Sequence, residues 1–378
     1  MIKAKAAASA SMLVLAALIL SGCSEAPEET DDPTTEVSAE AQEALDRAYE
    51  GVGSDLSDLA STTVPEGLDL YVMSCGEQLA TCAKPAAAVV EAGEAAGWSA
   101  QIVDGKLSPE GFATAIRQAI AGGADVLVPI GISCGAAAAA FQEAADAGVT
   151  IIGGGGVDDC DPKVWDSERL WLSDAGEFGF FGVFGELMAD YAYGKNDGEV
   201  KAIVINSTTN AWGPWITESF ESQLDELGGG EVLEVIDVSD PETADNSYLQ
   251  KVTSSLLANP EANALIVPTD SYLETGLAAA VDQAGFADQL TVIGAFGGDG
   301  AIDMIRSGQP GIDATVAMAT TWEGWGSVDT AIRILDGQDP AYIGQSVQVV
   351  DAGHNLPESG GYDGSIDFRA EFLEAWGK

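Results

Sequence analysis

Basic residues are scarce in this sequence, and histidine occurs once. The 378 residues include 15 Lys and Arg against 61 Asp and Glu, so the formal net charge is −46. Such a polyanion repels phosphate backbones, and no cluster of basic residues offsets the repulsion, which excludes general nucleic-acid binding. The single histidine, His354, argues against a His-dependent metal site or a Ser-His-Asp triad. We therefore expect no metal, no cofactor and no enzymatic activity.

The sequence also lacks a hydrophobic run long enough to cross a bilayer. Lys3 and Lys5 precede an apolar stretch that ends at Leu20, which is typical of a secretory signal. The following residues, up to Cys23, resemble the lipobox of bacterial lipoproteins. The resemblance implies removal of residues 1–22 and lipidation of Cys23; the alternative is an ordinary signal peptide with a coincidental cysteine.

The segment after the signal is rich in Glu, Asp, Pro and Thr and poor in large apolar residues. This composition predicts a flexible acidic tether over 23–66, within which residues 39–49 are expected to form a short amphipathic helix. The tether would hold the folded part clear of the membrane surface.

Few cysteines remain for the folded part. They are Cys75, Cys82, Cys134 and Cys160. An even number of cysteines in an exported chain favours disulfides, and three pairings are possible. We prefer Cys75–Cys82, a local loop, with Cys134–Cys160, which would join the ends of two consecutive strands. A site of four thiolates is the rival, but the spacing lacks a Cys-x-x-Cys element.

From residue 68 onward, short apolar runs alternate with alanine-rich amphipathic stretches. In the first half we expect strands at 68–73, 98–103, 125–130 and 149–153, and helices at 85–96, 109–121 and 135–147. After residue 161 the alternation restarts, with strands at 170–173, 201–206, 231–238, 264–268 and 290–294, and helices at 177–192, 215–227, 246–258 and 272–284. The pattern predicts an α/β protein with two parallel-sheet lobes.

Three stretches resemble the ribose/galactose-like, type I periplasmic binding proteins, the substrate-binding lipoproteins of bacterial ABC importers. They are Phe112–Ile152, Asn259–Gly285 and Leu290–Met318, and the likeness covers about 68–355. The resemblance implies two doubly wound lobes joined by a three-segment hinge. Lobe one would comprise 66–160 plus 319–346, and lobe two 161–318 plus 347–378.

Ligands of such sheets bind outside the carboxyl ends of the strands. That rule and the resemblance together suggest the ligand-binding residues Ser74, Gln78, Thr81, Ser133, Asn210, Trp212, Trp215, Asp270, Tyr272, Phe296, Asp299, Met318 and Trp322. Several positions that are polar in the family are aromatic or apolar here, and the arginine usual near the start of the lobe-two helix is absent. We therefore expect an aromatic cleft poor in fixed charge. The alternative is that some of the tryptophans fill the hinge core.

Three acidic or glycine-rich segments have simpler interpretations than ion or phosphate binding. Residues 158–161 do not have the spacing of a calcium loop, and a solvated turn is preferred. The glycine-rich loops at 153–156 and 297–300 match no phosphate-binding fingerprint.

The resemblance implies an extracytoplasmic, monomeric, lipid-anchored protein that binds a small molecule and carries out no covalent chemistry. A sugar or polyol is the expected ligand, delivered to an ABC transporter permease by closure of the two lobes. Three alternatives stay open. They are a sensor whose closed form engages a membrane receptor, a binder of an aromatic or cationic ligand, and an enzyme that depends on a cleft acid such as Asp270.

Overall fold

The computed structural model describes residues 38–378 except 54–55, 57–58, 174 and 209–211. The signal peptide, Cys23 and Asn210 lie outside the described residues. Within the described ranges, no helix has both the length and the apolar character needed to cross a membrane.

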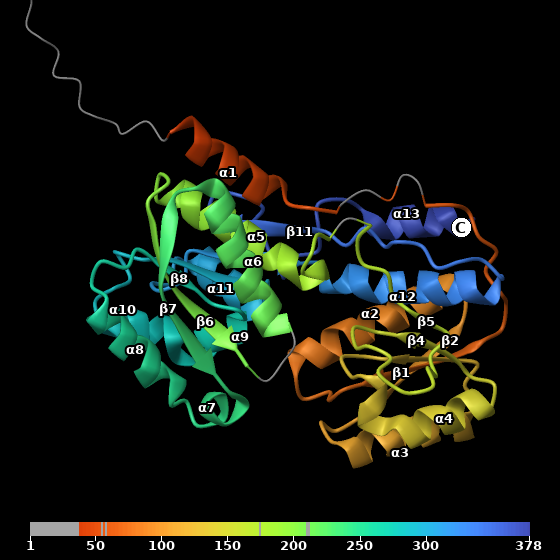
Figure 1. Cartoon of the computed structure of the whole chain (residues 1–378). Helices are drawn as coiled ribbons and strands as arrows, with labels where there is room; N and C mark the ends of the chain where they lie inside the picture. Colours follow the sequence, from red (N-terminus) through yellow and green to blue (C-terminus); the bar gives the residue numbers. More distant parts are fainter. Residues whose placement is uncertain (1–37, 54–55, 57–58, 174, 209–211) are drawn as a thin grey trace, which may run out of the picture. The chain divides into compact units, whose positions relative to one another are not determined.

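Lobe one is built on a five-stranded parallel sheet with the order β2-β1-β3-β4-β5. Its strands are β1 (Asp69–Ser74), β2 (Ser99–Asp104), β3 (Val126–Pro129), β4 (Thr150–Gly153) and β5 (Ser167–Glu168). One face is covered by α2 (Ala80–Ala96), α12 (Thr320–Leu335) and α13 (Phe368–Ala375). The other is covered by α3 (Pro109–Gly122), η1 (Cys134–Ala137) and α4 (Ala138–Asp146). Figure 1 shows these two layers.

Lobe two contains a six-stranded sheet with the order β11-β10-β9-β8-β6-β7, and only β11 runs antiparallel to its neighbour. The strands are β6 (Val200–Ser207), β7 (Gly230–Val238), β8 (Ala264–Ile266), β9 (Thr291–Phe296), β10 (Ala314–Met318) and β11 (Val347–Asp351). Helices α1 (Ala39–Glu50), α5 (Gly179–Lys195) and α6 (Trp212–Leu227) lie on one side. The other side carries α7 (Asp240–Ala244), α8 (Tyr248–Ala258), α9 (Asp270–Tyr272), η2 (Leu273–Leu277), α10 (Ala278–Gln283) and α11 (Asp299–Ser307).

The predicted α/β class with two lobes is confirmed. The predicted strands and helices lie within a few residues of the observed ones, with one exception just after residue 161. There the expected strand 170–173 is replaced by β5, which pairs with β4 and so extends the sheet of lobe one. The chain reaches lobe two at Trp171 and Leu172, which pack against its core shortly before α5. The boundary between the lobes therefore lies later than the position expected from the restart of the alternation.

Both ends of the described chain also lie differently from the expected division. The C-terminal helix α13 packs on lobe one, where Phe368 stacks on Trp322 with ring centroids 5.1 Å apart. After β11 the chain thus returns to lobe one instead of ending in lobe two. At the other end, α1 packs on α5 of lobe two, although its residues were assigned to the tether. The apolar face of each helix explains these positions, because both faces are buried.

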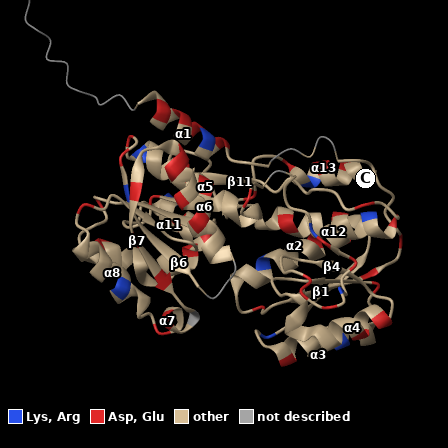
Figure 2. Ribbon diagram, in the orientation of Figure 1, with Lys and Arg blue, Asp and Glu red and all other residues tan. Residues whose placement is uncertain are grey.

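Acidic side chains are spread over helices and turns of both lobes, and basic ones are few (Figure 2). The negative charge is therefore a property of the outer surface rather than of one segment.

Candidate functional site

The carboxyl edge of the lobe-one sheet begins with Ser74 at the end of β1. Its side chain is buried, and its hydroxyl has no hydrogen-bond partner among the described residues. Gln78 follows on the loop into α2, Thr81 lies in the first turn of α2, and both are exposed. The Cys75–Cys82 disulfide closes this loop, with the two Cα atoms 5.4 Å apart. Three expected ligand contacts thus lie on one short, cross-linked segment.

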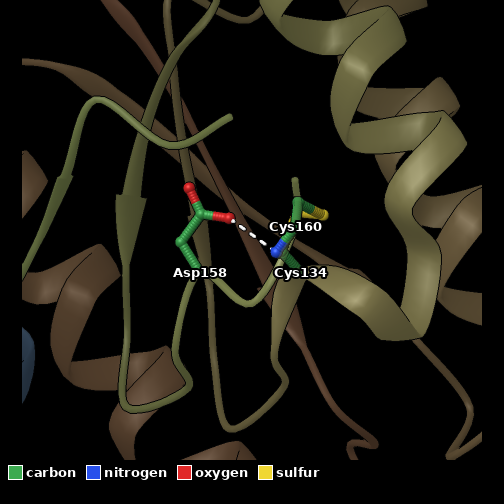
Figure 3. Close-up of side chains that lie close together, drawn as sticks. All are labelled: Cys134, Asp158 and Cys160. Atoms are coloured by element: carbon green, nitrogen blue, oxygen red, sulfur yellow. Dashed lines mark hydrogen bonds between the residues drawn. A yellow bond between two sulfur atoms is a disulfide. The ribbon is translucent and has the colours of Figure 1, made fainter. Parts of the chain in front are cut away.

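A second disulfide, Cys134–Cys160, joins the loop after β3 to the loop after β4. Beside it, the buried Asp158 carboxylate accepts a hydrogen bond from the Cys160 amide at 3.2 Å (Figure 3). It also accepts bonds from the amides of Val164 (2.7 Å) and Trp165 (2.8 Å). Both sulfurs are consumed by the disulfide, so this cluster of two cysteines and an acid offers a metal no thiolate. The Asp158 side chain instead fixes the turn by bonding to its main-chain amides. We expected a solvated turn here, and this acid is buried.

Ser133 lies between the two glycines of a Gly-x-Ser-x-Gly sequence at 131–135, which follows a strand as in a nucleophile elbow. Its backbone has φ −88°, outside the strained conformation of an elbow, and its hydroxyl accepts a hydrogen bond from the Val157 amide. The one histidine of the chain, His354, is held elsewhere by Asp351 and Tyr49. We therefore assign Ser133 no nucleophilic role.

The same edge of lobe one also carries a hollow of about 390 Å³ beside the start of α3. It is lined by Asp104, Lys106, Ser108, Glu110, Gly111, Thr114, Ala115 and Gln118. These polar residues follow β2, and the sequence analysis did not select them.

On lobe two, six aromatic side chains form a continuous set that we call the aromatic group. Its members are Trp171, Phe180, Phe181, Phe184, Trp212 and Phe296. The rings of Trp212 and Phe296 are nearly perpendicular, with centroids 5.3 Å apart. Both rings are only partly buried, so each keeps a surface open for contact.

Phe296 ends β9 with a φ of +84°, a backbone conformation that bulky side chains rarely adopt. Such outliers gather at functional sites, where the surrounding structure holds them. Phe296 therefore stays a predicted ligand contact at the end of β9.

Arg169 connects this group to lobe one. Its guanidinium lies 3.9 Å over the Trp171 ring and donates to the Glu323 carboxylate (2.8 Å) and to the Ser327 hydroxyl (2.7 Å) of α12. Burial raises the pKa of the Glu323 carboxyl, and the adjacent guanidinium opposes that rise. Sequence reasoning missed Arg169 and Trp171. The available signal was an arginine within an apolar stretch of a chain that has few basic residues.

Asp270 is buried at the start of α9 and supports the loop that follows β9. Its carboxylate accepts hydrogen bonds from the Thr315 hydroxyl (2.9 Å) and the Gly298 amide (2.9 Å). Burial raises the pKa of Asp270 to about 8. Nearby, the Glu274 carboxylate accepts from the Ala301 amide. The two acids therefore hold the first turn of α11.

The glycines of this loop make that arrangement possible. A Cβ added at Gly298 or Gly300 would meet the Glu274 carboxylate, and one at Gly294 would clash with Asp270. The glycine-rich loop thus lets acidic side chains lie next to its backbone. Their carboxyl groups accept hydrogen bonds from the loop amides that a phosphate-binding loop would offer to phosphate.

Three of the expected contacts lie in the hydrophobic core. Trp322 has no exposed surface, and its indole N–H donates to the Ile343 carbonyl at 2.7 Å. Tyr272 is buried against Tyr248, and Met318 is buried in lobe two. We therefore remove these three from the candidate site. Trp322 is therefore a core tryptophan, which was the alternative interpretation.

The remaining two expected contacts lie at the surface. Trp215 is 42% exposed on α6. Asp299, at the start of α11, forms an ion pair with Lys84 of α2 at 2.7 Å. This pair links the two lobes directly.

Comparisons with known proteins agree with this architecture. The sequence matches the model described as "Periplasmic binding protein domain" over residues 82–339. No curated protein matches it. AraP, an arabinose binding protein from Geobacillus stearothermophilus, has a similar structure with a TM-score of 0.64 and 17% identity, over 76% of this chain and 98% of that one.

Two further solved structures are similar to this chain. One is the 5-methylthioribose transporter solute binding protein from Thermotoga lettingae TMO (TM-score 0.60, 17% identity, 84% of this chain and 95% of that one). The other is an ABC transporter periplasmic solute binding protein from Actinobacillus succinogenes 130z with bound D-allose (TM-score 0.60, 17% identity, 76% and 98%). These likenesses show the fold, and the domain match covers more than half of the sequence. The chain therefore belongs to the periplasmic binding protein family and has the type I fold.

Proposed function

We propose that this protein is an extracytoplasmic solute-binding protein that captures a small neutral molecule between its lobes and delivers it to an ABC permease. A lipid on Cys23 would anchor it to the membrane, and the protein would act as a monomer without covalent chemistry. Family membership supports the solute-binding role, and the similar structures include proteins described as binding arabinose, 5-methylthioribose and D-allose.

The observation that carries the ligand class is the aromatic group. Trp212 and Phe296 offer partly open rings at the carboxyl edge of the lobe-two sheet. Aromatic faces stack on the apolar faces of sugar rings. Arg169, the cation in contact with the group, already has its charge balanced by Glu323. At the end of β1 in lobe one, the buried Ser74 hydroxyl has no hydrogen-bond partner among the described residues, and a ligand hydroxyl that reached it would supply one. A sugar or polyol fits these features.

A second candidate ligand is an aromatic or cationic molecule. The same rings would hold a cation by its attraction to their faces, and the net charge of −46 would favour its approach.

A thermal-shift screen of the full chain tests both. The panel contains L-arabinose, D-allose, 5-methylthioribose, galactitol, adenosine, benzoate and choline. A ligand present at about 100 times its Kd adds about 2.7 kcal/mol to the free energy of unfolding and so raises Tm. We expect a sugar or polyol to give the largest rise. A largest rise with choline or benzoate would favour the second candidate, and a panel without any rise would contradict the proposal.

Substitutions then locate the site. Trp212→Ala and Phe296→Ala should each weaken the best ligand about 10-fold or more, which corresponds to 1.4 kcal/mol or more of lost stacking. Leu257→Ala is the control, because Leu257 is 68% exposed on α8, away from the aromatic group. Unchanged affinity in both aromatic variants would place the ligand elsewhere.

A further inference from the structure

The residues before β1 were expected to be a tether, but the described part of them is docked along both lobes. We call the described residues of this segment (38–53, 56 and 59–66) the N-terminal strap. The match to the family domain begins only at residue 82. The strap is therefore a feature outside the matched domain.

The strap begins on lobe two. Its first helix, α1, buries Leu45 against α5, where Gly194 leaves room because a Cβ there would clash with the leucine side chain. Arg47 donates through Nε and Nη2 to both oxygens of Asp190, at 3.1 and 2.7 Å. The Asp190 side chain is 5% exposed, so the pair is shielded from water on that side. The Ser38 amide adds a bond to the Asp197 carboxylate.

The strap next runs antiparallel to the start of β11 and the residues just before it, a stretch that we call the crossover. Val52 and Val347 exchange two main-chain hydrogen bonds, at 2.9 and 3.0 Å. Gly51 and Gly53 flank Val52 with φ of +66° and +78°, and a Cβ on either would clash with main-chain oxygens of this crossover. Tyr49 donates its hydroxyl proton to Asp351 at 2.7 Å. The glycines thus permit a close approach that a larger residue would prevent.

The strap ends on lobe one. Leu56 is buried in the core that α2, α12 and α13 share. The Thr62 amide donates to the Ala375 carbonyl at 2.9 Å, and Arg333 donates to the Ala60 carbonyl at 2.8 Å. The indole N–H of Trp98 donates to the Pro65 carbonyl at 2.7 Å. One segment is therefore fastened to lobe two at its start, to the crossover in its middle and to lobe one at its end.

From these contacts we infer that the N-terminal strap is an additional connection between the lobes that limits how far they open. A rotation of one lobe against the other changes the position of Arg47 relative to Leu56, and the contacts at both points and the Val52–Val347 pairing between them resist that change. This restraint acts whichever ligand is bound. Release of the strap should widen the range of ligand-free conformations.

The test measures the lobe separation in the full chain without ligand. Cys23→Ser removes the cysteine that is not in a disulfide, and spin labels are placed at Ala139→Cys on α4 and Leu257→Cys on α8, both exposed. Val52→Pro removes the amide that bonds to Val347, whereas the control Val52→Thr keeps it. We expect the distance distribution to broaden about 1.5-fold or more in the proline variant only.

A second variant guards against misfolding of the first. Arg47→Gln combined with Tyr49→Phe removes the polar links of the strap and leaves its apolar face intact. It should broaden the distribution in the same direction, and hydrogen exchange of the α1 amides should accelerate about 10-fold. If neither variant changes the distribution, the strap does not restrain the lobes and the inference is overturned.

Discussion

Among individual residues, Asp270 shows how an acid near the site can act on the main chain instead of on a ligand. Its bonds to Thr315 and Gly298 hold the loop that presents Phe296. Because it is buried, its pKa is raised to about 8, and the nearby Glu274 contributes to the rise. The carboxyl is therefore neutral in the folded protein below that pH.

This shift predicts the pH dependence of stability. In the unfolded chain Asp270 ionises near its ordinary pKa of about 3.9, so between about pH 4 and pH 8 the unfolded state holds fewer protons than the folded one. The stability that the protonated Asp270 contributes to the folded state is fully present below about pH 4 and is lost as pH rises toward 8. Asp270→Asn should remove this dependence on pH. The unfolding free energy of the wild type should therefore fall relative to that of Asp270→Asn as pH rises, by at most about 1.4 kcal/mol per pH unit.

Urea unfolding of both proteins at pH 5, 6 and 7 measures it. Asp299→Asn, which removes an exposed carboxylate near the same loop, is measured alongside for comparison. Parallel curves for wild type and Asp270→Asn would contradict the prediction.

Among the elements, the two disulfides stiffen the loops that follow β1, β3 and β4 of lobe one. They close segments of different length, with sequence separations of 7 for Cys75–Cys82 and 26 for Cys134–Cys160. A cross-link stabilises by restricting the unfolded chain, and the effect increases with the length of the closed loop. The same edge of the sheet thus carries two constraints of unequal strength.

Replacing each pair by serines should separate the two contributions. The chain-entropy relation gives a loss of about 3.5 kcal/mol for Cys134→Ser with Cys160→Ser, and about 2.4 kcal/mol for Cys75→Ser with Cys82→Ser. Denaturant unfolding measures both, and each doubly substituted protein serves as the control for the other. Equal losses, or a larger loss for the shorter loop, would show that the entropic relation does not govern this lobe.

At the scale of the whole molecule, the charge of −46 is the dominant electrostatic property. Acids are spread over the surface of both lobes, so their mutual repulsion opposes compaction (Figure 2). Salt screens such repulsion between exposed charges.

Stability should accordingly increase with ionic strength. Between 20 mM and 500 mM NaCl we expect Tm to rise by roughly 2 °C or more, equivalent to about 1 kcal/mol for a chain of this size. A matched series in KCl should give the same rise, because screening depends on ionic strength. A constant or falling Tm would mean that specific ion pairs, such as Lys84–Asp299, outweigh the general repulsion.

Features whose determinants are local were predicted correctly from the sequence. Strand β1 was expected at 68–73 and lies at 69–74, because alternating apolar runs and helical periodicity are read over short windows. The disulfides Cys75–Cys82 and Cys134–Cys160 are those preferred, since the first joins near neighbours and the second joins loops after adjacent parallel strands.

It failed where the deciding contacts are distant. Trp212 and Trp322 both follow strand ends in the sequence. Trp322 is a core residue because α13 packs on it, whereas Trp212 stays a candidate ligand contact. The strap was taken for a tether because its composition is polar, whereas its docking depends on Gly194 and Val347 far along the chain. No local pattern encodes those partners.

The strap also affects the order in which the chain can fold. Its partners are among the last residues made, since Val52 pairs with Val347 and Thr62 bonds to Ala375 of α13. Closing loops of this length has a large entropic cost, so these contacts form late. The contacts of Val52 and Thr62 therefore form only when β11 and the C-terminal helix are complete, although the strap emerges early in synthesis. A chain that ends before α13 would leave its N-terminal segment partly undocked and open to proteolysis, which couples the two ends of the polypeptide in quality control.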